Sequence, residues 1–463
     1  MKTIGCDSGA IIRELTPAPG SVDAFRCLSG LPHCLFLDSA MRHPTRGRYS
    51  FVAADPFDFI TAPADGTDAL PRLRAALNGL ATPAHPDLPP FQGGAAGLFG
   101  YDLNRGLETL AAPRHDEFQV PALAIGLYDV VIAFDHAENR AWVISQGLPE
   151  HDPARRARRA ERRMRQFLGY LRQPRADASP GGAPRFATVP AEDLATQYPV
   201  SADGRLTSTF SAPMFRATIQ RVIDYIYAGD IFQVNIAQRL LCAAVENPLA
   251  IYLKLRRCNA APFAAYFDLG RYQILSASPE RFVSVRDRAV ETRPIKGTGP
   301  RCGSPEADLF AGQTLRASAK DRAENIMIVD LLRNDLARVC APASVRVTKL
   351  CGLEQYQFIQ HLVSVVHGRL APGHGVLDLI AAAFPGGSIT GAPKIRAMEI
   401  IAALEPTARG AYCGCLGYVG FNETCDLNIL IRTITAGAGW LQLPVGGGIV
   451  AQSVPEREYE ETW

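Results

Sequence analysis

The sequence lacks the features that mark membrane proteins, secreted disulfide-rich proteins and nucleic-acid-binding proteins. No apolar run approaches the length of a membrane-spanning helix, and the first residues, MKTIGCDSGAIIRELT, contain no apolar stretch long enough for a signal peptide. The net charge is only +2, which gives no reason to expect nucleic acid or a membrane as a partner. The 11 cysteines are dispersed without a C-x-x-C pair, so we expect free thiols in the cytoplasm instead of disulfides or a zinc site.

Nucleotide-binding loops are also missing from the sequence. No G-x-G-x-x-G stands between a predicted strand and a helix, which leaves little support for a dinucleotide-binding fold. Residues 384–394, FPGGSITGAPK, resemble a phosphate loop, but Ala-Pro separates Gly391 from Lys394 and no Ser or Thr follows that lysine. We expect a Gly-rich turn before a helix that begins near Pro393, with Thr390 near the helix N-terminus, where anions are favoured.

The composition is that of an ordinary globular protein, with one clear seam, which is a segment of different composition between two regions. Of the 463 residues, 47% are apolar and 20% are charged, which allows two domains or one large one. Residues 151–200 are rich in arginine and then in Pro, Gly and Ala, and predict an exposed helix followed by a flexible linker. The arginines come without interleaved aromatics, so a solvated helix face is expected there. The seam separates an N-terminal region, 1–150, from a motif-rich region, 201–463.

Short strand-like runs alternate with amphipathic helices along both regions. Strands are predicted at 272–277, 282–285 and 440–444, and helices at 211–228, 318–339, 376–383 and 392–404. Strands joined by short turns, with helices grouped between them, indicate an α+β fold with mainly antiparallel sheets.

A lysine and a carboxylate are placed at neighbouring strand ends. Lys296 belongs to TRPIKGT, which follows the turn SPERF with Glu280 by one short hairpin. A neighbouring charge or desolvation can leave a lysine amine neutral and nucleophilic, and a nearby carboxyl can then donate a proton. This pair is the first candidate for catalysis.

Two acidic segments could hold a metal ion. Glu324 lies inside an apolar helix, where a carboxylate must be paired, protonated or bound to metal. The run 456–461 follows a strand, Trp440–Pro444, and the glycines 446–448, whose backbone N–H groups could approach an anion. Helix salt bridges and a solvated terminus are the alternatives. If Glu461 and Glu324 converge, they form a Mg²⁺ site together with substrate oxygens.

Other polar residues stand on apolar elements. His361 and Tyr418 are two of these, and a lone histidine there is more often a satisfied core residue. Arg432 lies in the β-branched run ILIRTI and needs a buried anionic partner, which could be a protein acid or a substrate carboxylate.

Together these segments resemble the chorismate-utilising enzymes, which make anthranilate, aminodeoxychorismate, isochorismate or salicylate. The matching segments begin at Pro90 (PFQGGAAGLFGYDLNR), Gly229 (GDIFQVNIAQRL), Ser278 (SPERF), Thr292 (TRPIKGT), Ser318 (SAKDRAENIMIVDLLRND), Phe384 (FPGGSITGAPK), Ile431 (IRT) and Gly446 (GGGIVAQSVPEREYEET). The resemblance implies a large fold of two subdomains, with mainly antiparallel sheets packed face to face and helices outside.

Two positions distinguish the branches of this family. Anthranilate-forming members resemble PIAGT, with alanine in place of Lys296. Isochorismate- and salicylate-forming members also lack that lysine, and carry one at the position that matches Gln233. Lys296 with Gln233 resembles the branch that aminates chorismate para to its carboxylate. The alternatives kept open are an anthranilate- or salicylate-type enzyme and a non-catalytic amino-acid-binding subunit.

The resemblance also implies roles for individual residues. Lys296 would be the nucleophile and Glu280 the general acid, with Mg²⁺ held by Glu324 and Glu461. Substrate contacts are expected at Gly297, Thr298, His361, Thr390, Tyr418, Arg432, Gly446, Gly447 and Gly448. A tryptophan-binding pocket, regulatory or structural, would use Ser39, Arg48, Tyr49, Pro262, Phe263 and Ala264.

The same resemblance predicts a partner and shows one departure. Ammonia would come from a separate glutamine amidotransferase subunit, because nothing in this sequence resembles that enzyme's Cys-His-Glu site. Members of the family continue beyond the last glutamate into a helix with a carboxylate-contacting lysine, whereas the sequence here stops at Trp463. Either the sequence is truncated or another group takes the role of that lysine.

Overall fold

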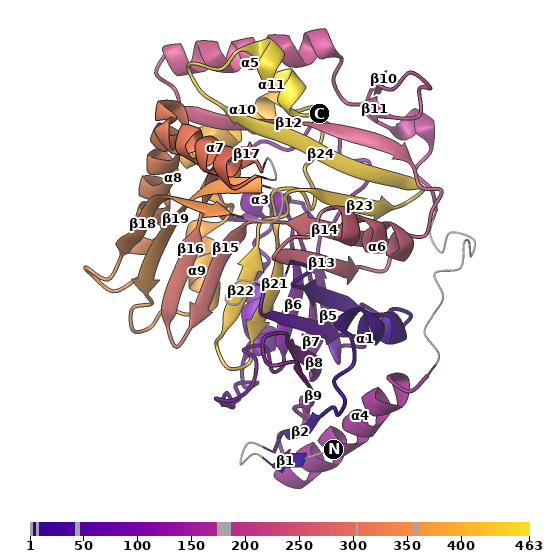
Figure 1. The fold of residues 1–463 in the computed structure, drawn as a ribbon. Coiled ribbons are helices and arrows are strands. Elements are labelled where there is room, and N and C mark those ends of the chain that lie inside the picture. Colours follow the sequence, from indigo (N-terminus) through magenta and orange to yellow (C-terminus); the bar gives the residue numbers. More distant parts are fainter. Residues whose placement is uncertain (1–2, 6–8, 42–46, 174–186, 302–303, 356–358) are drawn as a thin grey trace.

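Two antiparallel sheets form the centre of the molecule, and the helices lie outside them (Figure 1). The computed structural model describes residues 3–5, 9–41, 47–173, 187–301, 304–355 and 359–463. The α+β fold with face-to-face antiparallel sheets that the sequence predicts is confirmed.

The larger sheet has 14 strands within the described residues. In order across the sheet they are β1 (Thr3–Gly5), β2 (Ile11–Glu14), β9 (Arg140–Ser145), β8 (Val130–Asp135), β4 (Tyr49–Ala53), β3 (Leu35–Asp38), β13 (Phe263–Asp268), β14 (Tyr272–Ser278), β23 (Thr433–Gly437), β24 (Trp440–Ile449), β12 (Gln233–Ala243), β11 (Thr207–Ser208) and β10 (Tyr198–Pro199), with β20 (Gly391–Ala392) also paired to β12.

The second sheet has 10 strands in the same part of the chain. They run in the order β17 (Ile295–Pro300), β19 (Ile359–Arg369), β16 (Ala289–Arg293), β15 (Arg281–Arg286), β22 (Cys425–Asn428), β21 (Cys415–Gly420), β6 (Gly94–Phe99), β7 (Leu123–Tyr128) and β5 (Asp58–Ala62), with β18 (Arg346–Gln355) paired to β19. Both sheets combine strands from before and after the 151–200 seam, since β3 pairs with β13 and β6 with β21. The domain bounds at 150 and 200 stay a prediction, and residues 174–186 of the linker lie outside the described residues.

The helices begin and end close to the predicted positions where the sequence pattern is strong. Their bounds are α1 (Ser21–Leu28), α2 (Leu70–Leu77), α3 (Asn104–Leu107), α4 (Pro153–Tyr170), α5 (Ala212–Tyr227), α6 (Pro248–Cys258), α7 (Pro305–Ala317), α8 (Ala319–Ala337), α9 (Val376–Ala383), α10 (Lys394–Leu404) and α11 (Pro455–Glu461). Ser211 and Ser318 cap α5 and α8 by accepting hydrogen bonds from backbone N–H groups three residues later. None of the helices in the described ranges is long and apolar enough to cross a membrane.

Apolar side chains fill the space between the layers. Phe51 of β4 and Leu98 of β6 belong to the cluster that joins the two sheets. Helices α1, α4 and α6 cover the outer face of the larger sheet, where Met164 of the arginine-rich helix is buried. Helices α2, α8 and α9 cover the other sheet, and α5 and α10 pack on β12. The candidate catalytic residues lie on β17 (Lys296) and in the turn that follows β14 (Glu280).

Candidate active site

The structure brings Lys296 and Glu280 together. Glu280 lies in the turn between β14 and β15 and is 4% exposed. The backbone N–H of Ile295 donates to Oε1 of Glu280 at 3.3 Å, and Nζ of Lys296 donates to the carbonyl oxygen of Ser388 at 3.5 Å. The amine and the carboxyl therefore occupy one site, as the spacing in the sequence predicts. Ser388 was not identified from the sequence, although it lies within the FPGGSITGAPK motif.

Glu280 is suited to donate a proton. Burial raises the pKa of its carboxyl to about 7, while the Ser388 hydroxyl, the charge of Lys296 and the N–H of Ile295 favour the carboxylate and oppose this rise. A carboxyl with such a pKa is still about half protonated at neutral pH. It can therefore serve as a general acid, which an ordinary surface glutamate cannot do at that pH.

Gln233 and Gly448 form another wall of the site. Gln233 is 1% exposed, and its Oε1 atom has no hydrogen-bond partner among the described residues. A Cβ atom on Gly448 would lie 2.3 Å from Nε2 of Gln233 and 3.1 Å from Nζ of Lys296. Only glycine leaves room for both side chains at this position.

The three glycines 446–448 are part of a strand. The sequence predicts that the strand from Trp440 ends at Pro444, and this is wrong because β24 continues to Ile449. Gly446 and Gly448 pair with Ala237 and Asn235 of β12. The glycines thus line the site as part of a strand without side chains, which other residues of the protein can approach closely.

Carboxylates from α8 and α11 converge near Lys296. Burial raises the pKa of both Glu324 and Glu461, and the charge of Glu458 raises the pKa of Glu461 further. The charges of Lys296 and Lys320 lower both pKa values, so the same cations lie within electrostatic reach of both carboxyls. Glu458 was not singled out in the acidic run, although it is one helical turn before Glu461.

These carboxylates fit a magnesium ion that the substrate would help to bind. Nζ of Lys320 lies 4.0 Å from Oε1 of Glu324 and 3.8 Å from Oε1 of Glu458, so a cation already stands between acids of the two helices. Within the described ranges, no three Asp, Glu, His or Cys residues are close enough to enclose a metal. Mg²⁺ commonly takes one or two carboxylates and completes its shell with water and substrate oxygens. Glu324 and Glu461 suit that arrangement.

Gly297, Thr298 and His361 lie beside this acidic cluster. Gly297 has φ of 73°, and a Cβ atom on it would meet Cγ of Asp321 at 3.1 Å. Thr298 is opposite the buried His361 in the pairing of β17 with β19. The left-handed backbone at Gly297 allows α8 to approach the strand that carries Lys296.

Thr390 and Arg432 differ in how the structure places them. Thr390 is fully buried, and its hydroxyl donates to the carbonyl of Gly386 at 3.0 Å, so it has lone pairs but no free proton for a ligand. The expectation that Arg432 lies inside a strand is wrong. It precedes β23 at φ of 52° and is exposed, and no acid among the described residues pairs with it. Of the two partners considered, a substrate carboxylate remains.

Tyr418 lies in a different pocket from Lys296. Its ring stacks on Phe91 with centroids 4.5 Å apart, and it lines a pocket of about 80 Å³ that contains neither Lys296 nor Glu280. The expectation that the Tyr418 side chain contacts the substrate at Lys296 is therefore corrected, because this side chain belongs to the core between the sheets. The sequence pattern could not separate these two surroundings.

The residues predicted to bind tryptophan all line that second pocket. They are Ser39, Arg48, Tyr49, Pro262, Phe263 and Ala264. Arg48 is held by Asp135, with Nη2 to Oδ2 at 2.6 Å, and its guanidinium lies 5.0 Å from the centre of the Tyr49 ring. The sequence motifs therefore locate a real cavity, although they do not identify its occupant.

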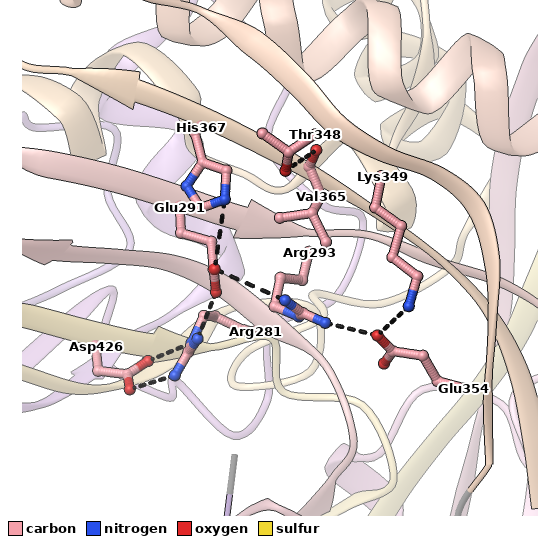
Figure 2. Close-up of polar contacts among 9 residues, drawn as sticks. All are labelled: Arg281, Glu291, Arg293, Thr348, Lys349, Glu354, Val365, His367 and Asp426. Atoms are coloured by element: carbon pink, nitrogen blue, oxygen red, sulfur yellow. Dashed lines mark hydrogen bonds and ion pairs between the residues drawn. The ribbon is translucent and has the colours of Figure 1, made fainter. Parts of the chain in front are cut away.

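A continuous ion-pair network joins this pocket to the strand before Lys296 (Figure 2). Arg281, which lines the pocket, contacts Asp426 at 2.9 Å and Glu291 at 2.7 Å. Glu291 also lies 3.7 Å from Arg293, which in turn contacts Glu354 at 2.7 Å. Arg293 comes three residues before Lys296, so the network extends from the second pocket to the end of the strand that leads to Lys296.

Comparisons with known proteins agree with this geometry. The chain matches the family model of chorismate binding enzymes over residues 33–463. It is 40% identical to the aminodeoxychorismate synthase component 1 of Salmonella typhimurium over 460 residues, which cover 95% of this chain and 92% of that protein. It is also 40% identical to the anthranilate synthase component 1 of Thermus thermophilus over 393 residues, 84% of this chain and 80% of that protein.

The fold has a counterpart among solved structures. The crystal structure of anthranilate synthase component I from Streptococcus pneumoniae superposes with a TM-score of 0.76 at 31% sequence identity, and the match covers 91% of each chain. The family model spans the described strands of both sheets except β1 and β2, and it includes the residues around Lys296. The chain therefore belongs to the family of chorismate binding enzymes.

Proposed function

We propose that this protein is component I of an aminodeoxychorismate synthase, which converts chorismate and ammonia to 4-amino-4-deoxychorismate on the route to 4-aminobenzoate and folate. The observation that carries the proposal is the position of Lys296 beside the buried carboxyl of Glu280 and near the amide of Gln233. Relatives from two branches are both 40% identical, so overall identity does not choose between them. Lys296 favours the aminodeoxychorismate branch, because anthranilate-forming members resemble the motif PIKGT with alanine in place of this lysine.

The site residues supply the steps of an amination. The unprotonated amine of Lys296 bonds to ring carbon C2 while the C4 hydroxyl departs, and Glu280 gives that hydroxyl its proton so that water leaves. Ammonia then adds at C4, the bond between C2 and the lysine breaks, and Lys296 is released as an amine. The Glu280 carboxylate takes the proton that the new amino group loses. Chorismate and ammonia thus give the aminated product and water.

Glu324 and Glu461 would hold Mg²⁺. When bound, the metal neutralises and orients the ring carboxylate of the substrate. The exposed guanidinium of Arg432 is suited to the other substrate carboxylate, because no described acid occupies it. Gly297, Thr298, His361 and Thr390, with Gly446, Gly447 and Gly448, would form the remaining walls.

Ammonia and tryptophan are the other proposed ligands. We expect ammonia from a glutamine amidotransferase subunit, in line with the "component 1" names of the relatives. We place a bound tryptophan in the pocket with Tyr418 and Phe263, where an indole could stack on aromatic rings. This pocket also keeps an amino-acid-binding subunit as the second candidate function.

Product identity tests the proposal. Purified full-length protein is incubated with chorismate, Mg²⁺ and ammonium, and the product is identified by mass and by its substitution pattern. We expect 4-amino-4-deoxychorismate. Without ammonium, intact-protein mass spectrometry should show chorismate minus water added to the wild type and absent from Lys296→Ala. Lys254→Ala, at an exposed lysine paired with Glu246, is the matched control and should keep the adduct.

Three outcomes would contradict the proposal. Anthranilate or salicylate as product would move the protein to a sister branch. An adduct that persists in Lys296→Ala would assign the nucleophile to another residue. No product with ammonium, combined with saturable binding of tryptophan, would favour the non-catalytic subunit.

A further inference from the structure

The larger sheet has a gap directly behind the site glycines. One edge of β12 pairs with β24 along its length, including the positions opposite Gly446 and Gly448. On the other edge, β20 pairs with Gln233 and Val234, and β11 pairs with Leu240 and Leu241. Between these two short strands, residues 235–237 have no strand partner on that edge in the part of the chain that the structure describes.

A buried ion pair takes the place of the missing strand. The N–H of Ala237 donates to Oε1 of Glu405 at 2.9 Å, and Nη2 of Arg409 donates to the carbonyl of Asn235 at 2.9 Å. Arg409 is bound twice to Glu405, through Nη2 to Oε1 at 2.6 Å and Nε to Oε2 at 2.9 Å. The two side chains are only 6% and 3% exposed. The carbonyl of Asn235 and the N–H of Ala237 are thus satisfied by side chains where a strand would normally satisfy them, while the N–H of Asn235 donates to the backbone carbonyl of Thr390 at 2.7 Å.

The same guanidinium reaches the other wall of the site. Nη1 of Arg409 donates to the carbonyl of Ile389 at 3.0 Å. Ile389 directly follows Ser388, whose carbonyl accepts the hydrogen bond from Lys296. The guanidinium of Arg409 therefore binds both β12, which carries Gln233, and the turn with Ser388, whose carbonyl contacts Nζ of Lys296. The planar group fixes the distance between these two elements.

Stability alone gives a weak reason for this arrangement. Removing two charges from water is costly, and well-packed apolar side chains often serve stability equally well. A planar guanidinium, however, aims several donors in fixed directions, which apolar side chains cannot do. The Glu405–Arg409 pair is therefore suited to fix the relative positions of β12 and the Ser388 turn.

We propose that the Glu405–Arg409 pair is a positioning device for Lys296, which holds β12 and the Ser388 turn at the separation that aims the amine at its substrate. Neither residue needs to touch the substrate. The inference rests on the proposed role of Lys296 as nucleophile, and it adds the residues that keep this nucleophile in place.

The test separates positioning from folding by following adduct formation. Arg409→Lys keeps a cation beside Glu405, but its three donors sit on one atom and cannot span the carbonyls of Asn235 and Ile389. With chorismate and without ammonia, we expect the Lys296 adduct to form at least about tenfold more slowly, with KM changed less than about threefold. Glu405→Gln keeps the Oε1 acceptor for Ala237 and Nη2 of Arg409 but puts an amide N–H₂ group opposite Nε of Arg409, so it should slow the adduct less than Arg409→Lys does.

Further measurements keep the inference falsifiable if Arg409→Lys does not fold. Glu405→Asp shortens the carboxylate by one methylene and should draw Arg409 away from both carbonyls, again slowing the adduct more than it changes KM. Amide exchange of a peptide over residues 233–240 should be faster in this variant. Normal adduct rates in folded variants despite faster exchange would overturn the positioning role. A wild-type protein that forms no adduct would instead overturn the proposed function itself.

Discussion

Replacing Glu280 by glutamine should make the protein more stable and less active. The carboxyl is buried, and it accepts a hydrogen bond from the N–H of Ile295. A glutamine has nearly the same shape, keeps an acceptor for this N–H and never carries a negative charge. It therefore mimics the protonated acid but cannot donate a proton to a leaving hydroxyl.

The size of the stability gain follows from the pKa of Glu280. This pKa is about 7 in the folded protein, against 4.5 for an ordinary glutamate. Because the folded state binds the proton more tightly, stability falls as the pH rises from about 4.5 to about 7, and the full cost is present above that range. A rise of about 2.5 units corresponds to about 3 kcal/mol at pH 8 and to less than about 1 kcal/mol at pH 5. Glu280→Gln lacks this cost.

Urea unfolding at pH 5 and pH 8 measures the effect. Glu280→Gln should exceed the wild type by about 3 kcal/mol at pH 8 and by under about 1 kcal/mol at pH 5. The exposed Glu138 gives the control, since Glu138→Gln removes a carboxylate at the surface and should change stability only slightly. Turnover of Glu280→Gln should fall about 100- to 10,000-fold, and wild-type turnover should decline as the pH rises through about 7. An equal stability change at both pH values, or retained turnover, would refute the reasoning.

The remaining predictions concern the glycine wall and the metal. Gly448→Ala places a Cβ atom 2.3 Å from the amide of Gln233, so turnover should drop at least about tenfold while stability falls by only about 1 kcal/mol, because that amide can rotate away. Gly447→Ala meets its nearest atom at 3.7 Å and should lose less activity, and equal losses would contradict the steric explanation. Glu461→Gln and Glu324→Gln should each raise the Mg²⁺ concentration for half-maximal turnover at least about tenfold, and an unchanged Mg²⁺ titration would exclude them as ligands.

The sequence predicts local features of this fold well. Ser211 and Ser318 mark the starts of two helices, because a serine before an apolar-periodic run caps the first turn. The spacing of the motifs around Glu280 and Lys296 places both on adjacent strand ends, which depends on one short hairpin. These signals act over a few residues and need no knowledge of distant contacts.

The errors arise where tertiary contacts decide. Pro444 predicts the end of a strand, yet β24 continues because β23 no longer pairs beyond Gln442, so the missing N–H of the proline is not needed there. Arg432 stands in a β-branched run, but its left-handed φ interrupts the strand. Tyr418 is expected among the substrate contacts, and only the packing of the two sheets shows that its ring stacks on Phe91.

The interleaving of the strands also has a consequence for synthesis on the ribosome. β23 and β24 lie in the middle of the larger sheet between β14 and β12, and β21 and β22 lie inside the other sheet. At roughly 5 to 20 residues per second, the chain from Ser278 to Thr433 takes on the order of ten seconds to be made. During this time β14 waits with an unpaired edge, which is a template for aggregation. The nascent chain is therefore expected to depend on chaperones until its last strands emerge, and those same strands carry the glycines of the catalytic site.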